Sequence, residues 1–424
     1  MKYLSYRNKL IILLCLVTVF MGNMITDASE LKTQAWTAWE KGEITQTGEL
    51  AQEMIKSKSE RMSGLHLLFL KAFIEGDYEE SLQLYKEIDK GYERYGELDK
   101  TVVNAYLHLG RYSEAEQFAV SRKMEEREIS RLKQLKNYPF KARLDSVAVI
   151  PFAAGPLSDY FPGFEAELNG QKIIANVDTG GTFLHMSPDR AKEFGIELIP
   201  FGKGRAAGAA QTDLFHGIAK SFCLGDAEFK NVPVMAVAAL KGQKFIIFGT
   251  NILQQFLSTL DYPKKQLVLS PRENAEFRKG HLAKLPEDQV EIPFHMWGDH
   301  YMFVQGAMGE FKDLNFFIDT GLVLIRGDEN GNPRQAAFTT HAGMYEEWGF
   351  DAEEVKRKWI KSPLSLSLGP LSQEGHYLTT SGQPFGPFGG IKIHGLLSHA
   401  FLKHYTWTID FTKRVYIFSR NKQQ

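Results

Sequence analysis

The chain has 424 residues, of which 43% are apolar and 24% charged, the usual balance for a folded globular protein. A length of this size suggests roughly two to four domains. The formal net charge of −1 provides no overall electrostatic attraction to nucleic acid or to an acidic membrane, so we expect no nucleic-acid partner.

The N-terminus has the pattern of a secretory signal. Lys2, Arg7 and Lys9 precede an apolar run at 10–20, and small polar residues follow it. The run is short for a transmembrane span, which needs about 20 apolar residues. We therefore expect residues 1–28 to be a cleaved signal and the protein to be exported, either periplasmic or secreted. The alternative is an uncleaved membrane anchor, which is the one way in which we expect this chain to meet a membrane.

The sequence offers little for a metal or a disulfide. Cleavage of the signal would leave Cys223 as the only cysteine, which cannot form an internal disulfide. The twelve histidines include no His-Glu-x-x-His pair of the kind that binds zinc in peptidases. We expect no cofactor.

Residues 29–140 have a helical pattern with evenly spaced glycines. Gly42, Gly76 and Gly110 follow one another at intervals of 34 residues. In the second and third units, an aromatic residue and then a small residue, Ser81 or Ala115, follow the glycine. The glycine suits a tight turn, and the small residue lets two helices approach closely.

This segment resembles tetratricopeptide repeats, whose period is 34 residues with one helix–turn–helix in each repeat. The resemblance implies a helical module that docks a protein partner. A charged stretch at 121–136 is predicted to be a helix that covers the exposed end of the stack. The alternative is an ordinary helical bundle in which the glycine spacing is accidental.

From residue 145 the pattern changes to short apolar runs separated by turns, which is typical of an all-β fold. Residues 164–180 read as a β-hairpin with Asn169-Gly170 at its turn, followed by Asp-Thr-Gly. Residues 302–321 have the same layout, with a turn at Gly309 and a second Asp-Thr-Gly.

A second internal repeat indicates a duplicated unit. Residues 251–270 and 400–419 align without a gap at an offset of 149, and the matched pairs include Thr259 with Thr408. We therefore predict two β lobes, lobe 1 at 145–272 and lobe 2 at 287–424. Between them, residues 271–289 read as a polar loop, and residues 341–359 read as a helical insertion within lobe 2.

The two Asp-Thr-Gly triplets indicate a specific chemistry. Hydrolysis of a peptide bond without a metal needs one carboxylate to activate water and a second, protonated, to donate to the carbonyl oxygen. Two carboxylates about 3 Å apart cannot both ionise, so they share one proton and supply both roles. Asp178 and Asp319 each end an apolar run at the same place in a duplicated lobe. Two structural Asp turns in a non-catalytic β protein are the alternative interpretation.

Residues 145–420 resemble an aspartic peptidase of the pepsin and retropepsin type, built as two fused lobes. Lobe 1 carries the closer likeness, in its active-site turn and following helix at 177–196, the hairpin at 221–237 and the apolar-Gly segment at 245–253. The fold class expected for the chain is thus multidomain, with an all-α helical repeat followed by an all-β bilobal acid-protease fold.

The resemblance implies the function of an aspartic endopeptidase acting on a peptide or protein substrate. It assigns Asp178 and Asp319 as the catalytic pair, and it places a flap at 204–211. The residues that it assigns to shaping the two active-site turns are Thr179, Gly180, Thr320 and Gly321.

Some positions depart from the family pattern. Gly181 and Leu322 follow the two triplets, where Ala or Ser is usual, and Ser398 stands where Gly249 stands in lobe 1. No flap tyrosine occurs near 205–215. The alternative function is therefore a catalytically inactive peptide-binding scaffold, in which the lobes hold an extended peptide.

Overall fold

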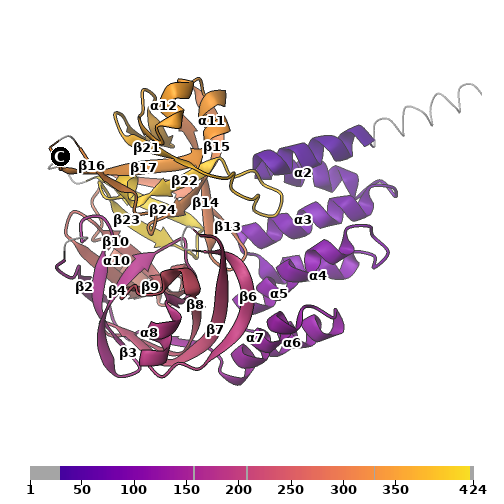
Figure 1. Cartoon of the computed structure of the whole chain (residues 1–424). Helices are drawn as coiled ribbons and strands as arrows, with labels where there is room; N and C mark the ends of the chain where they lie inside the picture. Colours follow the sequence, from indigo (N-terminus) through magenta and orange to yellow (C-terminus); the bar gives the residue numbers. More distant parts are fainter. Residues whose placement is uncertain (1–28, 156–157, 207–208, 329, 421–424) are drawn as a thin grey trace, which may run out of the picture. The chain divides into compact units, whose positions relative to one another are not determined.

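The computed structural model describes residues 29–155, 158–206, 209–328 and 330–420, so the predicted signal at 1–28 lies outside the described residues. Helices occupy the chain up to Asn137, and strands dominate from Lys141 onward (Figure 1). This confirms the predicted order of a helical region followed by a β-rich region. None of the helices in these ranges is long and apolar enough to cross a membrane.

The chain divides into two compact units. Unit 1 comprises Met1–Ala105 with Gly389–Ile391, and unit 2 comprises Tyr106–Phe388 with Lys392–Gln424. The described helices that begin in unit 1 are residues 29–41, α2 (Ile44–Met54), α3 (Arg61–Glu75), α4 (Tyr78–Glu87), the 3₁₀ turn η1 (Tyr95–Leu98) and α5 (Asp99–His108). The last of these helices runs across the boundary into unit 2.

The three evenly spaced glycines lie at the turns between consecutive helices. Gly42, Gly76 and Gly110 have φ of +79°, +87° and +68°, the left-handed conformation that ends a helix at little cost in glycine. The small residue Ser81 is fully buried, and its hydroxyl donates to the Phe69 carbonyl at 3.1 Å, so α3 and α4 pack closely. The helix pairs thus turn where the spacing indicates; their identity as tetratricopeptide repeats stays a prediction.

The helices α6 (Tyr112–Ser121) and α7 (Glu126–Asn137) belong to unit 2. The prediction of a single helix over 121–136 was therefore wrong at its start, because the chain turns through Lys123, whose φ is +52°. The helix α7 lies against strand β6 (Leu198–Ala206) of lobe 1 (Figure 1). In the neighbouring strand β7, His216 places its Nδ1 2.5 Å from Oε1 of Gln134 in α7. This helix is therefore part of the β unit's own packing.

The two lobes repeat one strand order. In lobe 1 the order is β8-β5-β9-β4-β3-β7, and in lobe 2 it is β21-β17-β22-β15-β14-β19, with the same parallel and antiparallel pairings in turn. The lobe 1 strands in this order are Ala227–Val237, Leu184–Met186, Ile246–Gly249, Gln171–Asp178, Gly163–Leu168 and Ala209–Leu224. The lobe 2 strands are Tyr377–Ser381, Pro333–His341, Gly395–Ser398, Phe311–Asp319, Tyr301–Met308 and Leu366–Leu368.

Shorter elements complete each lobe. Lobe 1 also has β1 (Lys141–Arg143), α8 (Pro188–Glu193), η2 (Ala238–Leu240) and α9 (Thr250–Leu253). Lobe 2 also has β13 (His295–Trp297), β16 (Ile325–Gly327), α11 (Ala342–Glu347), α12 (Ala352–Lys356), β18 (Trp359–Lys361), β20 (Leu371–Gln373) and α13 (His399–Leu402). The helical insertion predicted at 341–359 thus consists of two short helices and the start of a strand.

A separate sheet joins the lobes, in the order β12-β24-β23-β10-β11-β2. Its strands are Gln289–Pro293, Val415–Ser419, Thr406–Asp410, Phe256–Asp261, Gln266–Pro271 and Ala148–Pro151. At its centre β10 and β23 pair antiparallel, with Thr259 opposite Thr408 and their hydroxyls 2.6 Å apart. Because these two residues correspond in the internal repeat, the sheet has an approximate twofold axis between them.

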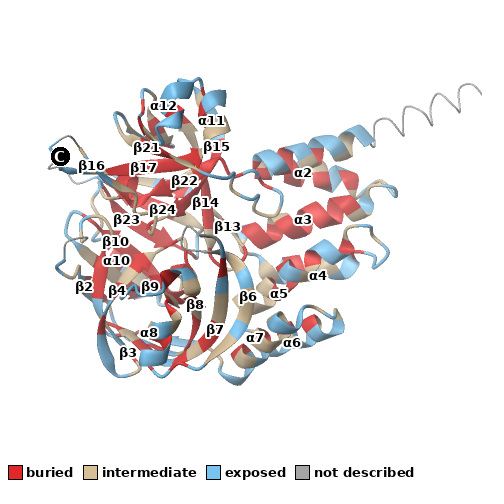
Figure 2. Cartoon of the chain, viewed as in Figure 1, coloured by how far each residue is buried: buried red, intermediate tan, exposed pale blue. Residues whose placement is uncertain are grey.

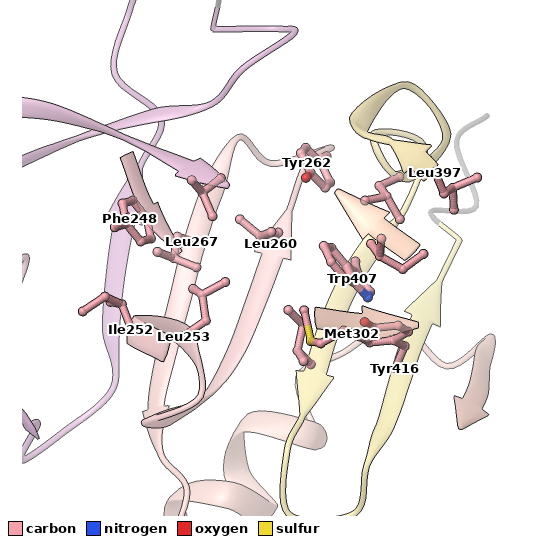
Figure 3. Packing of buried hydrophobic residues seen from close by; sticks show 14 of the residues in the cluster. Phe248, Ile252, Leu253, Leu260, Tyr262, Leu267, Met302, Leu397, Trp407 and Tyr416 are labelled. Carbon is pink, nitrogen blue, oxygen red and sulfur yellow. The ribbon is translucent and has the colours of Figure 1, made fainter. Parts of the chain in front are cut away.

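The core lies around this central sheet. Every residue of β10 and β23 is buried (Figure 2). Leu260 lies opposite Trp407 across the strand pair, and Tyr416 stacks edge-on against the Trp407 ring at 5.2 Å (Figure 3). Side chains from both lobes therefore form one continuous apolar cluster.

The segment between the lobes is not simply a loop, as its polar sequence had suggested. Helix α10 (Ala275–Leu282) forms there because the Asn274 side chain caps it, accepting from the backbone N–H groups of Glu276 and Phe277. Its His281 Nε2 is 2.7 Å from Thr259 Oγ1, and its Arg278 forms a bidentate ion pair with the buried Asp410. The helix thus fastens the linker to the central sheet.

We predict that Asp410→Ala destabilises the fold by about 3 kcal/mol, because it leaves the Arg278 charge unpaired. Asp410 also accepts from the backbone N–H groups of Thr412 and Lys413, both at 3.1 Å, and these bonds would be lost as well. Urea denaturation at neutral pH would measure the change, with the exposed Asp288→Ala as the control. A loss below about 1 kcal/mol, the usual size for a surface pair, would contradict this role.

Candidate active site

The two Asp-Thr-Gly turns follow equivalent strands, one in each lobe. Asp178 ends β4 and Asp319 ends β15, each the second strand of a hairpin. In the first hairpin, Asn169 and Gly170 have φ of +48° and +80°, as the predicted Asn-Gly turn requires. The tight turn fixes the register of β4 and therefore the place at which Asp178 leaves the sheet.

The threonines of the two turns bind the lobes to each other. Thr179 N donates to Thr320 Oγ1 at 2.9 Å, and Thr320 N donates to Thr179 Oγ1 at 3.1 Å. Each hydroxyl in turn donates to a backbone carbonyl of the opposite strand, Thr179 to Ile318 at 2.9 Å and Thr320 to Val177 at 3.3 Å. Both side chains are fully buried. This reciprocal network holds the two turns at one fixed separation.

The glycines make room for the two carboxylates. A Cβ at Gly180 would lie 2.6 Å from Asp319 Oδ1, and a Cβ at Gly321 would lie 2.1 Å from Asp178 Cγ. Any larger residue at either position would push into the carboxylate of the other lobe. Each lobe's turn therefore faces the opposite lobe's aspartate, and the structure brings Asp178 and Asp319 together.

The electrostatics of the pair place a proton on Asp319. Burial raises the pKa of Asp319 well above its ordinary value, and the neighbouring Asp178, through its charge and a side-chain hydrogen bond, raises it further. Asp178 Oδ1 instead accepts from Gly180 N at 2.8 Å. Asp319 Oδ1 is buried with no hydrogen-bond partner among the described residues. The environment thus favours the protonated form of Asp319, beside a second carboxyl group that accepts a backbone hydrogen bond.

A glycine and a serine occupy equivalent positions behind the two turns. Gly249 lies beside Asp178, where a Cβ would come within 1.8 Å of the Thr182 carbonyl oxygen. Ser398 lies beside Asp319, and its hydroxyl donates to the Ala336 carbonyl at 2.5 Å and accepts from Ala400 N at 3.0 Å. The serine therefore fits in lobe 2 with its hydroxyl bonded, whereas lobe 1 requires glycine.

The predicted flap lies at the end of the hairpin formed by β6 and β7. The register runs from Leu198 opposite Gly217 to Ala206 opposite Ala209. Residues 207–208 lie outside the described residues. Arg127 of α7 approaches the base of this hairpin, with Nη1 3.5 Å from the Phe201 carbonyl oxygen.

Sequence reasoning missed the histidine next to the first turn. A Cβ at Gly181 would lie 3.7 Å from His185 Nε2 and 3.8 Å from Asp178 Oδ2, so the imidazole and the carboxylate flank the same point. Burial lowers the pKa of His185 to about 4, although the charge of Asp178 opposes the shift. The neutral ring accepts from Thr182 N at 3.1 Å. No familiar motif marks this residue; its place at the second position of β5, after the active-site turn, is the one available signal.

Within the described ranges, no group of three or more His, Cys, Asp or Glu side chains is arranged to hold a metal ion.

Comparison with known proteins supports an aspartic protease interpretation for lobe 1. Residues 164–252 match the family model for aspartyl proteases, a segment that contains Asp178 but not Asp319. A retropepsin-like aspartic protease from Rickettsia conorii, known from its crystal structure, is similar over 31% of this chain and 93% of that chain, at 20% identity and a TM-score of 0.24. No curated protein matches the chain.

The raised pKa of Asp319 predicts a pH-dependent stability effect. The folded state holds the Asp319 proton more tightly than the unfolded chain does, so this group's contribution to stability falls as pH rises above about 4. Because asparagine cannot ionise, Asp319→Asn removes this loss of stability at higher pH. Its free energy of unfolding should match the parent near pH 4 and exceed it by more than about 1 kcal/mol near pH 8.

Denaturant titrations at both pH values would measure this difference, with Asp313→Asn, at an exposed position of the same strand, as a matched control. A stability difference that stays constant between the two pH values would show that Asp319 is not protonated in the folded protein.

Proposed function

We propose that this protein is an aspartic endopeptidase that acts outside the cytoplasm after export. The observation that supports this most directly is the pair of aspartates, one from each lobe, joined by a hydrogen bond and held by reciprocal threonine contacts. A structural role alone would not require two half-buried carboxyl groups to face each other, because their mutual repulsion costs stability.

The raised pKa of Asp319 supports different roles for the two aspartates. A water molecule attacks the carbonyl carbon of the scissile peptide while Asp178 takes one of its protons and Asp319 donates its proton to the carbonyl oxygen. The resulting gem-diol collapses when a hydroxyl returns its proton to Asp319 and the proton on Asp178 passes to the leaving nitrogen. The C–N bond breaks, and the carboxyl and amine products leave the pair in its original state.

We expect hydrolysis of a mixed peptide library by the mature protein, inhibited by pepstatin. Activity should be highest on the acid side of neutrality and fall as pH rises, because deprotonation of Asp319 removes the donor to the carbonyl oxygen. Asp178→Asn and Asp319→Asn should each reduce kcat by at least about 10³-fold, while circular dichroism shows the fold retained.

The same variants separate the enzyme from the inactive peptide-binding scaffold. If parent and variants bind peptides equally and none cleaves, the protein is a scaffold. If both variants cleave like the parent, another group is the catalyst.

We further propose that the helical segment docks a protein partner or substrate. The left-handed turn glycines and the buried small residue Ser81 support a repeat-like stack of helix pairs. Because α6 and α7 pack within the β unit, a deletion should stop before α5. A protein lacking residues 29–98 should cleave short peptides within about threefold of the parent but lose activity on its protein target. Loss of short-peptide hydrolysis in a folded deletion protein would show that these helices support the active site instead.

A further inference from the structure

Unit 2 contains a cavity of about 370 Å³ that the catalytic chemistry described above does not use. Its wall combines the α5–α6 turn with α7, the segment after the first active-site turn, residues of strands β7 and β8, residues of α9 and just after it and, from lobe 2, Asp299. The apolar part of the wall includes Leu107, Leu135, Phe140, Phe183 and Val234. The helices therefore close one side of this space against lobe 1.

The cavity begins close to the catalytic pair. Thr182 lines the cavity and follows Asp178 by four residues. Its backbone N and its hydroxyl are both within hydrogen-bond distance of His185 Nε2, at 3.1 Å and 3.0 Å. That imidazole flanks the same point as the Asp178 carboxylate. A ligand in the cavity would thus lie one short segment of chain away from the reacting groups.

Asp299 gives the cavity a negative group. It lies in the cavity wall, and its side chain is 30% exposed, so a ligand can reach it. Burial alone would raise the pKa of Asp299, but His300, 2.6 Å from the carboxylate, and the nearby Arg131 lower it below the usual range. The Asp299 carboxylate is therefore ionised at neutral and at mildly acid pH.

Two groups beside Asp299 would compete with a bound cation: His300, whose Nδ1 is 2.6 Å from Asp299 Oδ1, and Arg131. The Arg131 guanidinium is already held by Glu128 in a bidentate pair, with distances of 3.0 Å and 2.5 Å. Burial lowers the pKa of His108 to about 4 and that of His216 to about 3, so both rings are neutral near pH 7.

A second acceptor lies in the same wall. Asn251 is 3% exposed, and its Nδ2 donates to the Asp299 carbonyl at 2.9 Å, which fixes the orientation of the amide. Its Oδ1 is buried without a hydrogen-bond partner among the described residues. An unsatisfied buried acceptor is costly unless a donor reaches it at some stage of function.

We propose that this cavity is a specificity site that binds a cationic group on an apolar stem, carried by the peptide substrate and paired with Asp299. This assignment rests on the proposed peptidase function for its substrate, but the binding itself does not require hydrolysis. The stem would contact the apolar wall, and the ammonium or guanidinium would donate to the carboxylate. A substrate carboxylate is disfavoured because it would have to displace Glu128 from Arg131.

Two sources supply this chemistry: the side chain of a lysine or arginine, and the free amino terminus of a peptide. Two peptide series distinguish them. In one, both ends are blocked and a single lysine moves along an otherwise apolar sequence, with norleucine as the uncharged match. In the other, no lysine is present and the amino terminus is either free or acetylated.

Binding would be measured by calorimetry on the full chain carrying Asp178→Asn, so that no peptide is consumed. We expect one series to bind at least about tenfold more tightly when its cation is present, as for a charge-assisted hydrogen bond in a partly buried site. Asp299→Asn should remove that preference. Gln254→Lys, which places a cation in the wall while keeping Asp299, should remove it too. Asp288→Asn, an equal charge change at an exposed site, should leave it intact.

Equal binding of norleucine and lysine peptides together with equal binding of free and acetylated ones would overturn the proposal, as would a preference that survives both Asp299→Asn and Gln254→Lys. Stronger binding of a glutamate peptide or of a free carboxyl terminus would overturn it as well. Hydrolysis by the parent protein is scored separately. Cleavage without a cation preference would support the peptidase function and contradict only the cation site. A cation preference without cleavage would support the cation site and contradict the peptidase function.

Discussion

The reciprocal hydrogen bonds between Thr179 and Thr320 are the contact on which the candidate site depends. Each threonine donates through its backbone and accepts through its hydroxyl, so neither lobe can shift without breaking bonds in a fully buried place. The pair of carboxyl groups is unstable by itself, because two neighbouring charges repel. The threonine network supplies the constraint that keeps them together, and the raised pKa of Asp319 is its electrostatic result.

The central sheet extends the same constraint to the whole β unit. Thr259 pairs with Thr408 in the way that Thr179 pairs with Thr320, as equivalent residues on either side of one approximate twofold axis. The two lobes share an apolar core across this sheet, so the site is built on one continuous core. The lobes are nevertheless not interchangeable: Gly249 is required in its place, whereas its equivalent Ser398 makes two hydrogen bonds.

Much of the fold could be predicted from the sequence, because short motifs and an internal repeat indicate it. The hairpin turn at Asn169-Gly170, the two Asp-Thr-Gly turns and the internal repeat are all local patterns, and the structure places the two aspartates opposite each other. Helix α10 was missed because its stabilisation comes from a cap at Asn274 and an ion pair to Asp410, which is distant in the sequence.

The wall of the cavity was beyond sequence reasoning for the same reason. Arg131, Asn251 and Asp299 lie on three separate segments, and nothing in their local sequence indicates that they meet. His185 has no motif around it, and its proximity to Asp178 arises from the strand that follows the turn. Such residues acquire their surroundings through tertiary structure alone.

The pairing of β10 with β23 also sets the order in which this chain can be completed during synthesis. Strand β10 is finished at Asp261, but one of its edges finds its partner only after Thr406–Asp410 have left the ribosome. Until then lobe 1 presents an open strand edge, which is a template for association with other chains. Because Thr259 pairs with its own equivalent, that edge is nearly self-complementary, so a nascent or truncated lobe 1 is suited to pair with a second copy of itself. Completion of lobe 2 within the same chain removes this hazard by covering the edge.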